Sequence, residues 1–366
     1  MPDPATQTAR RASPAPVSRE LALLRHLVRG ERDPLATDLA DPALVQSLLL
    51  VARRHRLASY AYARLRELGL VPLLPPPLAT AAKATALLEQ RRVEQLAAEL
   101  GRLDGLATAA GVPLLFLKGP LFAQRYYGSV DARGVADLDV LVRDPAALEP
   151  VLLAAGYRRA FRVPVTLRIG RAFAHHFEYE RGDVHVDVHW ALQRQAGFRL
   201  DHGRVWSTAT EVELAGRRYA AASDEVELVL QLLGLVTDVQ VGKLVLRTAV
   251  DVRQLLAAVG GGIDWDAFAA ARERERILRP CVYALRATHD LLDERPADPA
   301  LARLLDRPLR GLPPVELATR VALGGPLGPR ERLRALGVYE SGRPVSAAWW
   351  AVSLPARLAV YGLTRH

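Results

Sequence analysis

The chain has 366 residues, of which 50% are hydrophobic and 24% are charged, a composition that is typical of a globular protein and argues against disorder over its whole length. Its net charge of +9 favours an anionic partner such as a nucleotide, a nucleic acid or an acidic surface, although charge that only maintains solubility gives the same value. Cys281 is the only cysteine, which excludes an intrachain disulfide and a zinc site built from cysteines, and fits a reducing compartment.

Neither end of the chain carries a clear targeting or membrane signal. The stretch "MPDPATQTARRASPAPVS" has no apolar segment of the secretory kind, so we expect residues 1–18 to be a disordered lead and the protein to be cytoplasmic. No run of about 18 uninterrupted apolar residues predicts a membrane span. Pro355 and Arg357 interrupt the apolar stretch "AAWWAVSLPARLAVYGL", which favours a packed or surface amphipathic helix over a membrane anchor.

Residues 19–111 are predicted to form an N-terminal helical region. Leucines at helical spacing lie between Ser18 and Gly30, and a further helical stretch begins after Asp41, a good N-cap residue. A proline-rich tract that ends at Pro77 then precedes a long helix, which Gly111 ends. On one side of this helix we place Leu87, Leu88, Val93, Leu96, Leu100 and Leu103.

Residues 112–222 are predicted to form a small α/β core. The runs "VPLLFL" and "VADLDVLV" are short, apolar and bounded by breakers, which indicates strands, and "FEYERGDVHVDVHWAL" indicates a hairpin. The stretches "GPLFAQRYYG" and "DPAALEPVLLAAGY" indicate capped helices. Helical patterns return over 223–300, and 301–366 is interpreted as a Pro/Gly-rich linker with a C-terminal segment of unknown role. The predicted fold class is therefore α/β (α+β), with a small mixed sheet flanked by helical regions.

Two carboxylates lie inside the predicted strand "VADLDVLV". Side chains alternate faces along a strand, so Asp137, Asp139 and Leu141 share one face and the apolar neighbours share the other. Two close carboxylates raise each other's pKa unless a cation lies nearby, and oxygen ligands of this kind suit Mg²⁺. The alternative is that both aspartates point to solvent from an edge strand.

The segment "FLKGPLF" leads from the first predicted strand to a helix N-terminus. Free N–H groups and the helix dipole make such a terminus an anion site, which Gly119 would let a phosphate approach and Lys118 would supply with charge. The segment is not a P-loop, because it lacks the G-x-x-x-x-G-K-[ST] pattern. Arg133 is a further candidate for phosphate binding, with a surface salt bridge as the alternative.

The predicted strand "HVDVHW" carries a third candidate carboxylate. His185, Asp187 and His189 share one face of this strand. Asp187 is therefore a possible partner of the first two aspartates, and the histidines are candidates for orienting neighbours. An H-x-D-x-H run can also form a transition-metal site. We assign a structural role to His175 and His176.

These motifs together resemble a bacterial nucleotidyltransferase family of the DNA polymerase beta-like superfamily. The resemblance lies in "FLKGPLFAQRYYGSVDARGVADLDVLV" and "VHVDVHWAL", with weaker similarity in the helical stretch "LRTAVDVRQLL", and it covers about residues 20–300. The chain departs from the wider superfamily where Lys118–Gly119 replaces the usual Gly-Gly or Gly-Ser.

The resemblance implies an enzyme that transfers an NMP from an NTP such as ATP to a hydroxyl group. Asp137, Asp139 and Asp187 would hold two Mg²⁺ ions, for which Mn²⁺ is a possible substitute, and pyrophosphate would leave. Lys118, Gly119 and Arg133 would contact the phosphates, and Lys243 is a looser candidate for the same role. The acceptor would be a small molecule, a peptide, a protein or an RNA.

Two other functions stay open at this point. One is a nucleotide-binding scaffold or regulator that keeps the fold without catalysis. The other is a nucleic-acid-binding protein. The net charge of +9 is compatible with this function, but the sequence shows no basic stripe with interleaved aromatic residues.

Overall fold

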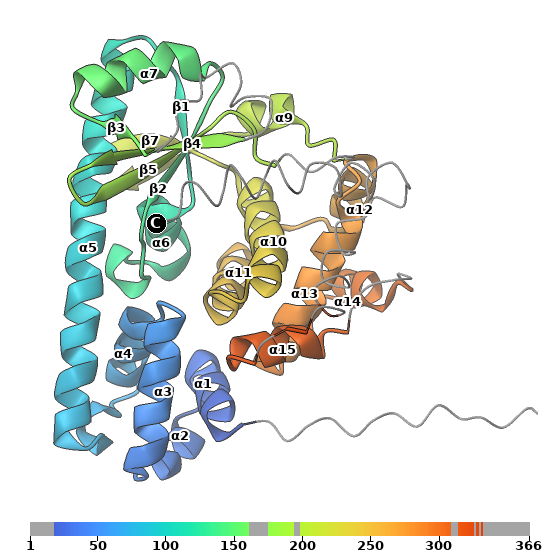
Figure 1. The fold of residues 1–366 in the computed structure, drawn as a ribbon. Helices are drawn as coiled ribbons and strands as arrows, with labels where there is room; N and C mark the ends of the chain where they lie inside the picture. The colour runs from blue at the N-terminus through green and yellow to red at the C-terminus, as the bar shows by residue number, and fades with distance from the viewer. Residues whose placement is uncertain are drawn as a thin grey trace, which may run out of the picture.

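The structure of the chain is a computed structural model that describes residues 18–160, 175–193, 198–308, 314–325, 327–328 and 331. The predicted disordered lead, apart from Ser18, and the apolar C-terminal stretch lie outside these residues. The described part combines a mixed sheet with helices at both ends, which confirms the predicted α/β class (Figure 1).

The N-terminal part of the molecule is a group of helices that leads into one long helix. Asp41 caps α3 by accepting hydrogen bonds from two backbone N–H groups, as its position before Pro42 predicts. The predicted second helical stretch is two helices rather than one, because the chain turns at Arg56, whose φ is 52°. The helices here are α1 (Arg19–Arg29), α2 (Arg32–Asp38), α3 (Pro42–Arg54), α4 (Ala58–Glu67) and α5 (Pro76–Ala109).

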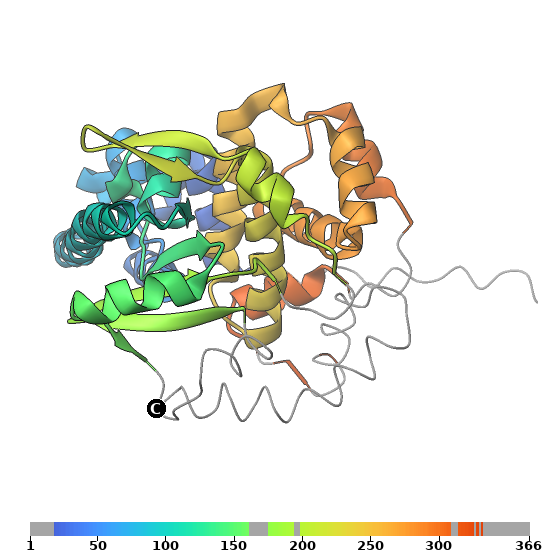
Figure 2. The same cartoon turned by 90° about the horizontal axis from the view of Figure 1, so that it is seen from above.

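The long helix α5 runs along two different cores. Its C-terminal half packs its leucines against the sheet, as predicted, whereas Leu87 and Leu88 are 46% and 68% exposed. The assignment of these two leucines to the packed side was wrong, because the buried side of α5 here carries Ala82, Ala86 and Val93. At about 100° per residue, Leu87 and Leu88 point away from that side. Figure 2 shows α5 end-on beside the sheet.

The sheet has seven strands in the order β3-β4-β5-β2-β1-β7-β6. The inner strand β2 pairs antiparallel with β1 and parallel with β5, and β1 pairs parallel with β7. The hairpin β6–β7, which the sequence patterns did not predict, completes one side. The strands are β1 (Leu114–Leu117), β2 (Leu138–Val142), β3 (Arg158–Arg159), β4 (His176–Arg181), β5 (Val184–His189), β6 (Thr210–Leu214) and β7 (Arg217–Ala221).

The two faces of the sheet pack differently. One face carries Val140, Val186 and Phe177 and packs on α5 and on α7 (Pro145–Ala154). The opposite face carries a smaller apolar cluster that includes Leu117 and Leu141 and packs on α9 (His202–Ser207) and α10. The aspartates of β2 and β5 lie on this second face, because they alternate with the apolar residues of the first.

The C-terminal helices share one hydrophobic core with the N-terminal helices. Leucines of α1 and α3 belong to the same cluster as those of α10 and α13. A short helix, α15, packs Leu317 and Val321 into this core, so part of the region predicted as a linker is a packed helix. These helices are α10 (Asp224–Val241), α11 (Val245–Val259), α12 (Trp265–Arg274), α13 (Leu278–Leu292), α14 (Pro299–Asp306) and α15 (Glu316–Ala322).

No single helix in the described ranges is both long enough and apolar enough to cross a membrane. The helices α2 and α3 reach the required length and apolar content only when they are taken together, and the chain bends by 117° between them.

Candidate active site

Three carboxylates meet on the open part of the second sheet face. The parallel register of β2 and β5 sets Asp139 directly opposite Asp187, and Asp137 lies two residues before Asp139. Their side chains alternate with the buried Leu138 and Val186 of the other face. Because β2 has paired strands on both sides, the alternative of an edge strand is excluded.

The carboxylates are buried enough to affect one another's ionisation. The side chains of Asp139 and Asp187 are 16% and 22% exposed. Burial, with the charge of Asp139 as the next cause, raises the pKa of Asp137 above its usual range and raises that of Asp187 to about 8. A cation bound between these carboxylates would offset their repulsion and favour their ionised forms, so the cluster is a candidate cation site.

Asp139 differs from the other two acids because a histidine supports it. Burial raises the pKa of Asp139, but the hydrogen bond from His189 and the positive charge of Lys118 outweigh burial and hold the pKa below its usual value. His189 Nε2 lies 2.9 Å from Asp139 Oδ1, the position expected for a residue that orients a carboxylate. His185 is the other candidate for orienting the acids. Its side chain is 50% exposed, and its Nδ1 lies 3.6 Å from Oε1 of Glu180 instead.

The Lys118–Gly119 turn joins β1 to α6 (Gly119–Tyr127) beside the acids. Lys118 has a φ of 49° and a ψ of −139°, a conformation that non-glycine residues rarely adopt. Its backbone N–H donates a hydrogen bond of 2.8 Å to Glu227 Oε1, from the first turns of α10. Burial raises the pKa of Glu227 to about 7. The sequence did not single out Glu227, which is 109 residues away along the chain.

Two arginines that the sequence did not single out face the acids. Burial and the charge of Asp139 are the largest influences on the pKa of Asp137, and both raise it. The positive charges of Arg247, Arg56 and Lys118 act in the opposite direction and lower this pKa. Arg247 lies on α11, and its Nε is buried without a hydrogen-bond partner in the described part of the chain. Arg56 lies in the α3–α4 link, so the N-terminal and C-terminal helical regions both contribute charge to this site.

The link that carries Arg56 lies directly against the segment before β2. A Cβ atom at Gly134 would lie 2.9 Å from the carbonyl oxygen of Arg56, so only glycine permits this approach. A cavity of about 500 Å³ opens here between the sheet and the N-terminal helices. Its lining residues include Arg53, Arg56, Arg92, Ala136 and His185.

Two of the predicted phosphate contacts lie elsewhere. Arg133 is 4% exposed and forms a two-pronged ion pair with Asp251 of α11, with both N–O distances 2.7 Å. Tyr127 donates a third hydrogen bond to Asp251, so the guanidinium of Arg133 serves the packing of α6 on α11. Lys243 lies exposed between α10 and α11, and no hydrogen bond or ion pair of its side chain is found among the described residues.

The chain is similar in sequence to a known protein family. The sequence matches, over residues 41–293, the family described as "Uncharacterised nucleotidyltransferase". No match was found among curated proteins. A solved structure of ANT(2")-Ia in complex with adenylyl-2"-tobramycin is similar at 18% sequence identity and a TM-score of 0.36, covering 49% of this chain and 98% of that chain.

Proposed function

Because the chain belongs to this nucleotidyltransferase family, we propose that it transfers an NMP from an NTP such as ATP to a hydroxyl group and releases pyrophosphate. The acceptor would be a small molecule, a peptide, a protein or an RNA. The observation that carries the proposal is the register pair Asp139–Asp187, with Asp137 on the same sheet face and the Lys118–Gly119 turn on the neighbouring strand.

The carboxylate cluster suits Mg²⁺ by the chemistry of its donor atoms. Oxygen ligands are those that Mg²⁺ prefers, and Mn²⁺ accepts similar sites. The raised pKa values of Asp137 and Asp187 mean that a dication would favour the ionised forms of both groups. Asp137, Asp139 and Asp187 would therefore hold up to two ions. When bound, these ions would neutralise charge on the triphosphate and lower the pKa of the acceptor hydroxyl.

The protein's own groups would bind and orient the phosphates. The N–H groups of Gly119 and Leu121 belong to the first turn of α6, have no acceptor within the helix and donate to no backbone carbonyl elsewhere in the described residues, so they would contact an anion. Lys118, Arg56 and Arg247, whose charges all lower the pKa of Asp137, would add positive charge. His189 would keep the Asp139 carboxylate oriented through its hydrogen bond.

The proposal predicts that Asp137→Asn and Asp187→Asn abolish nucleotidyl transfer. The assay incubates α-³²P-labelled NTPs with Mg²⁺ and a panel of amino sugars, peptides and RNA, and measures pyrophosphate and labelled acceptor. Asp183→Asn is the matched control, because Asp183 is an exposed residue of the same hairpin. Release of pyrophosphate by Asp137→Asn at the wild-type rate would contradict the proposal.

A binding measurement keeps the test independent of the acceptor. Calorimetry with a non-hydrolysable ATP analogue should detect binding that needs Mg²⁺, and the affinity should fall ~10- to 100-fold or more when Asp137 is replaced by asparagine. Equal affinity of the wild type and this variant in the presence of Mg²⁺ would count against the proposed role of Asp137.

A further inference from the structure

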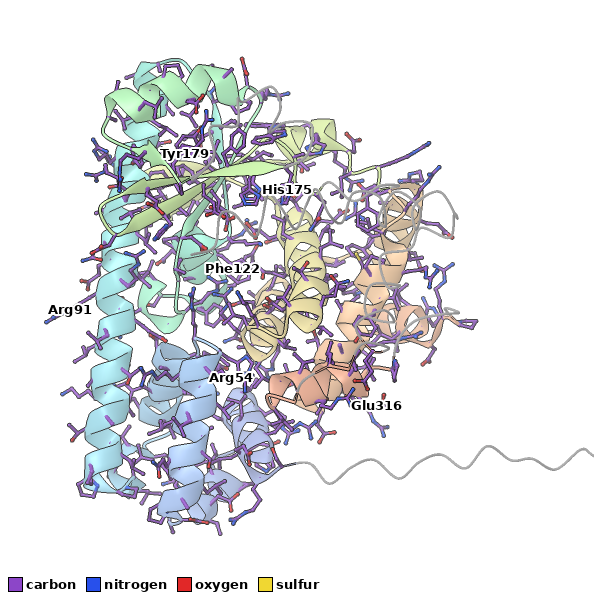
Figure 3. The ribbon with its side chains drawn as sticks, in the orientation of Figure 1. Arg54, Arg91, Phe122, His175, Tyr179 and Glu316 are labelled. Atoms are coloured by element: carbon purple, nitrogen blue, oxygen red, sulfur yellow. The ribbon has the colours of Figure 1, made fainter. Side chains whose placement is uncertain are left out.

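Three histidine rings gather beside the carboxylates, where β4 begins and β5 ends. His176 pairs with His189 across the two strands, and His175 precedes β4 on the side that faces α10 (Figure 3). The ring centroids of His175 and His176 lie 4.6 Å apart, and those of His176 and His189 lie 4.9 Å apart. One ring nitrogen of each histidine lies within 4.8 Å of the others.

The hydrogen bonding of His189 leaves one of its nitrogens without a partner. A carboxylate only accepts hydrogen bonds, so Nε2 carries the proton in the contact with Asp139. With the proton on Nε2, Nδ1 of the neutral imidazole carries a lone pair. This Nδ1 is buried and accepts no hydrogen bond from any residue that the structure describes.

His176, on the neighbouring strand, also has a buried ring nitrogen without a hydrogen-bond partner within the described ranges. This nitrogen is Nδ1, whereas Nε2 lies 3.9 Å from Glu178 and 4.0 Å from Asp187. A buried polar atom without a partner is destabilising, so two of them on neighbouring strands require an explanation. His175 is held in place by its carbonyl oxygen, which accepts a hydrogen bond of 3.0 Å from the Trp190 N–H.

We propose that His175, His176 and His189 form a second metal site, separate from the carboxylate site, that takes a borderline transition-metal dication such as Zn²⁺. Neutral imidazole is a preferred ligand of Zn²⁺, Cu²⁺ and Ni²⁺, and a poor one for Mg²⁺. Nitrogen ligands lie about 2.0–2.1 Å from Zn²⁺ and therefore ~3.4 Å from each other in a tetrahedral site. Closing the three rings onto an ion thus requires shifts of about 1 Å.

The carboxylates around the histidines strengthen the assignment. A histidine that binds a metal commonly donates its other N–H to a carboxylate, which fixes the tautomer and the ring orientation. His189 does this with Asp139 at 2.9 Å, whereas Nε2 of His176 lies 3.9 Å from Glu178 and 4.0 Å from Asp187, beyond hydrogen-bond distance. His189 therefore faces the carboxylate site with one nitrogen and the histidine site with the other. The histidine site does not depend on nucleotidyl transfer.

Metal binding by the full-length chain tests this proposal without any nucleotide. After treatment with a chelator, the wild type should bind one Co²⁺ with the strong visible absorption of a tetrahedral site, and Zn²⁺ should displace it. His176→Ala and His175→Ala should each raise the Kd for Zn²⁺ at least ~100-fold, the upper range for loss of an outer partner. His185→Ala is the matched control, since His185 lies on β5 but is 50% exposed and outside the cluster; its Kd should equal that of the wild type.

The carboxylate site is the main competing location for the ion. Asp187→Asn should keep the Co²⁺ spectrum if the histidines hold the ion. Loss of the spectrum in Asp187→Asn, or equal Zn²⁺ affinity in the wild type and in folded His176→Ala, would overturn the proposal. Circular dichroism establishes that each variant is folded. Failure of the proposed nucleotidyl transfer would instead appear in the Mg²⁺-dependent assay and leave these spectra unchanged.

Discussion

Lys118 shows at the scale of one residue how the site combines strain with charge. Its φ of 49° and ψ of −139° belong to a region that costs a non-glycine residue about 1–3 kcal/mol. The hydrogen bond from its N–H to Glu227 holds this conformation, and its positive charge lowers the pKa of both Asp137 and Asp139. The strained backbone of Lys118 is thus found at a residue whose ammonium charge acts on both Asp137 and Asp139.

We predict that Lys118→Gly stabilises the protein and weakens nucleotidyl transfer. Glycine adopts the required backbone conformation without strain, so the free energy of unfolding should rise by ~1 kcal/mol after the entropy of the unfolded chain is counted. Transfer should fall because the ammonium beside the carboxylates is lost. Urea unfolding and pyrophosphate release measure the two effects.

Lys118→Ala is the control that separates strain from charge. Alanine also lacks the ammonium but cannot relax the backbone, so it should lose activity without any gain in stability. A Lys118→Gly variant less stable than Lys118→Ala would contradict the assignment of strain to this turn.

The candidate site could be predicted from sequence where a local pattern marks its residues. Alternation along each strand singled out Asp137, Asp139 and Asp187, and the resemblance to a nucleotidyltransferase family joined the two strands in one site. Glu227 and Arg247 carry no comparable local signal, because only the packing of distant helices brings them to the acids. Arg133 illustrates the reverse problem: an arginine next to an acidic strand suggests phosphate binding, yet its partner Asp251 lies 118 residues away.

At the scale of elements, the segments bounded by strong breakers were predicted well, and those with weaker signals were not. The hairpin β6–β7 turns at Ala215 and Gly216, both with positive φ, and lacks the Asn-Gly or Asp-Gly pair that marks such turns. Helix α15 is short and lies in a Pro/Gly-rich stretch, so only its tertiary contacts reveal it.

The contact between α3 and α15 depends on a buried histidine. His55 follows α3, is 1% exposed, and its Nε2 lies 2.8 Å from the carbonyl oxygen of Ala322 at the end of α15. Burial lowers the pKa of His55 from 6.5 to about 4, although the hydrogen bond to Ala322 partly opposes this shift. The folded protein therefore binds a proton at this ring only at lower pH than the unfolded chain does.

We predict that this histidine makes the protein less stable as the pH falls from 6.5 towards 4. As the pH falls, the unfolded chain takes up the proton before the folded protein does, so the free energy of unfolding should decrease by up to about 3 kcal/mol over this range. Above about pH 7, His55 is neutral in both states and its titration should add no pH dependence. His55→Gln keeps a hydrogen-bond donor for Ala322 but does not titrate. Urea unfolding of both proteins across this pH range measures the difference, and parallel curves would contradict the prediction.

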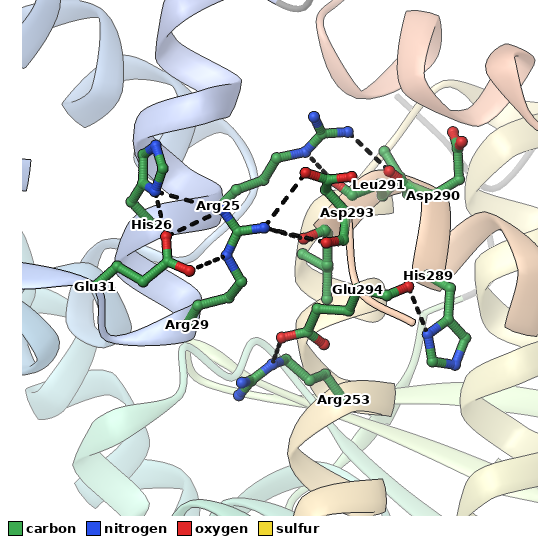
Figure 4. A network of polar contacts seen from close by, with 11 residues as sticks. Arg25, His26, Arg29, Glu31, Arg253, His289, Asp290, Leu291, Asp293 and Glu294 are labelled. Carbon is green, nitrogen blue, oxygen red and sulfur yellow. Dashed lines mark hydrogen bonds and ion pairs between the residues drawn. The ribbon is translucent and has the colours of Figure 1, made fainter. Parts of the chain in front are cut away.

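At the scale of the whole molecule, helices from the two ends of the chain form one unit. The sequence patterns separated 19–111 from 223–300, because the intervening strands have a different periodicity. In the structure, one hydrophobic core contains leucines from both regions. A polar network connects them as well: Arg25 Nε donates to the carbonyl oxygen of Leu291 at 2.8 Å, and its Nη2 to that of Asp290 at 2.8 Å (Figure 4).

This network stabilises the C-terminal end of α13. The last carbonyl groups of a helix have no partner within the helix, and positive side chains placed there satisfy them and interact favourably with the helix dipole. Arg29 adds a hydrogen bond of 3.1 Å to the carbonyl oxygen of Asp293, just after the helix. Since both arginines lie on α1, the first described helix should open only together with α13.

We therefore predict that Arg25→Ala weakens α1 and α13 to the same extent. Loss of two hydrogen bonds from a charged donor should lower the local free energy of opening by roughly 1.5–3 kcal/mol, which corresponds to amide exchange ~10- to 160-fold faster in both helices. Hydrogen–deuterium exchange with mass spectrometry measures both segments in one experiment. Arg19→Ala is the control, because Arg19 is 65% exposed and pairs only with Asp38 and Asp41 of the N-terminal region among the described residues; its effect should stay below ~1 kcal/mol. Faster exchange in α1 with unchanged exchange in α13 would mean that the two ends of the chain open as separate units.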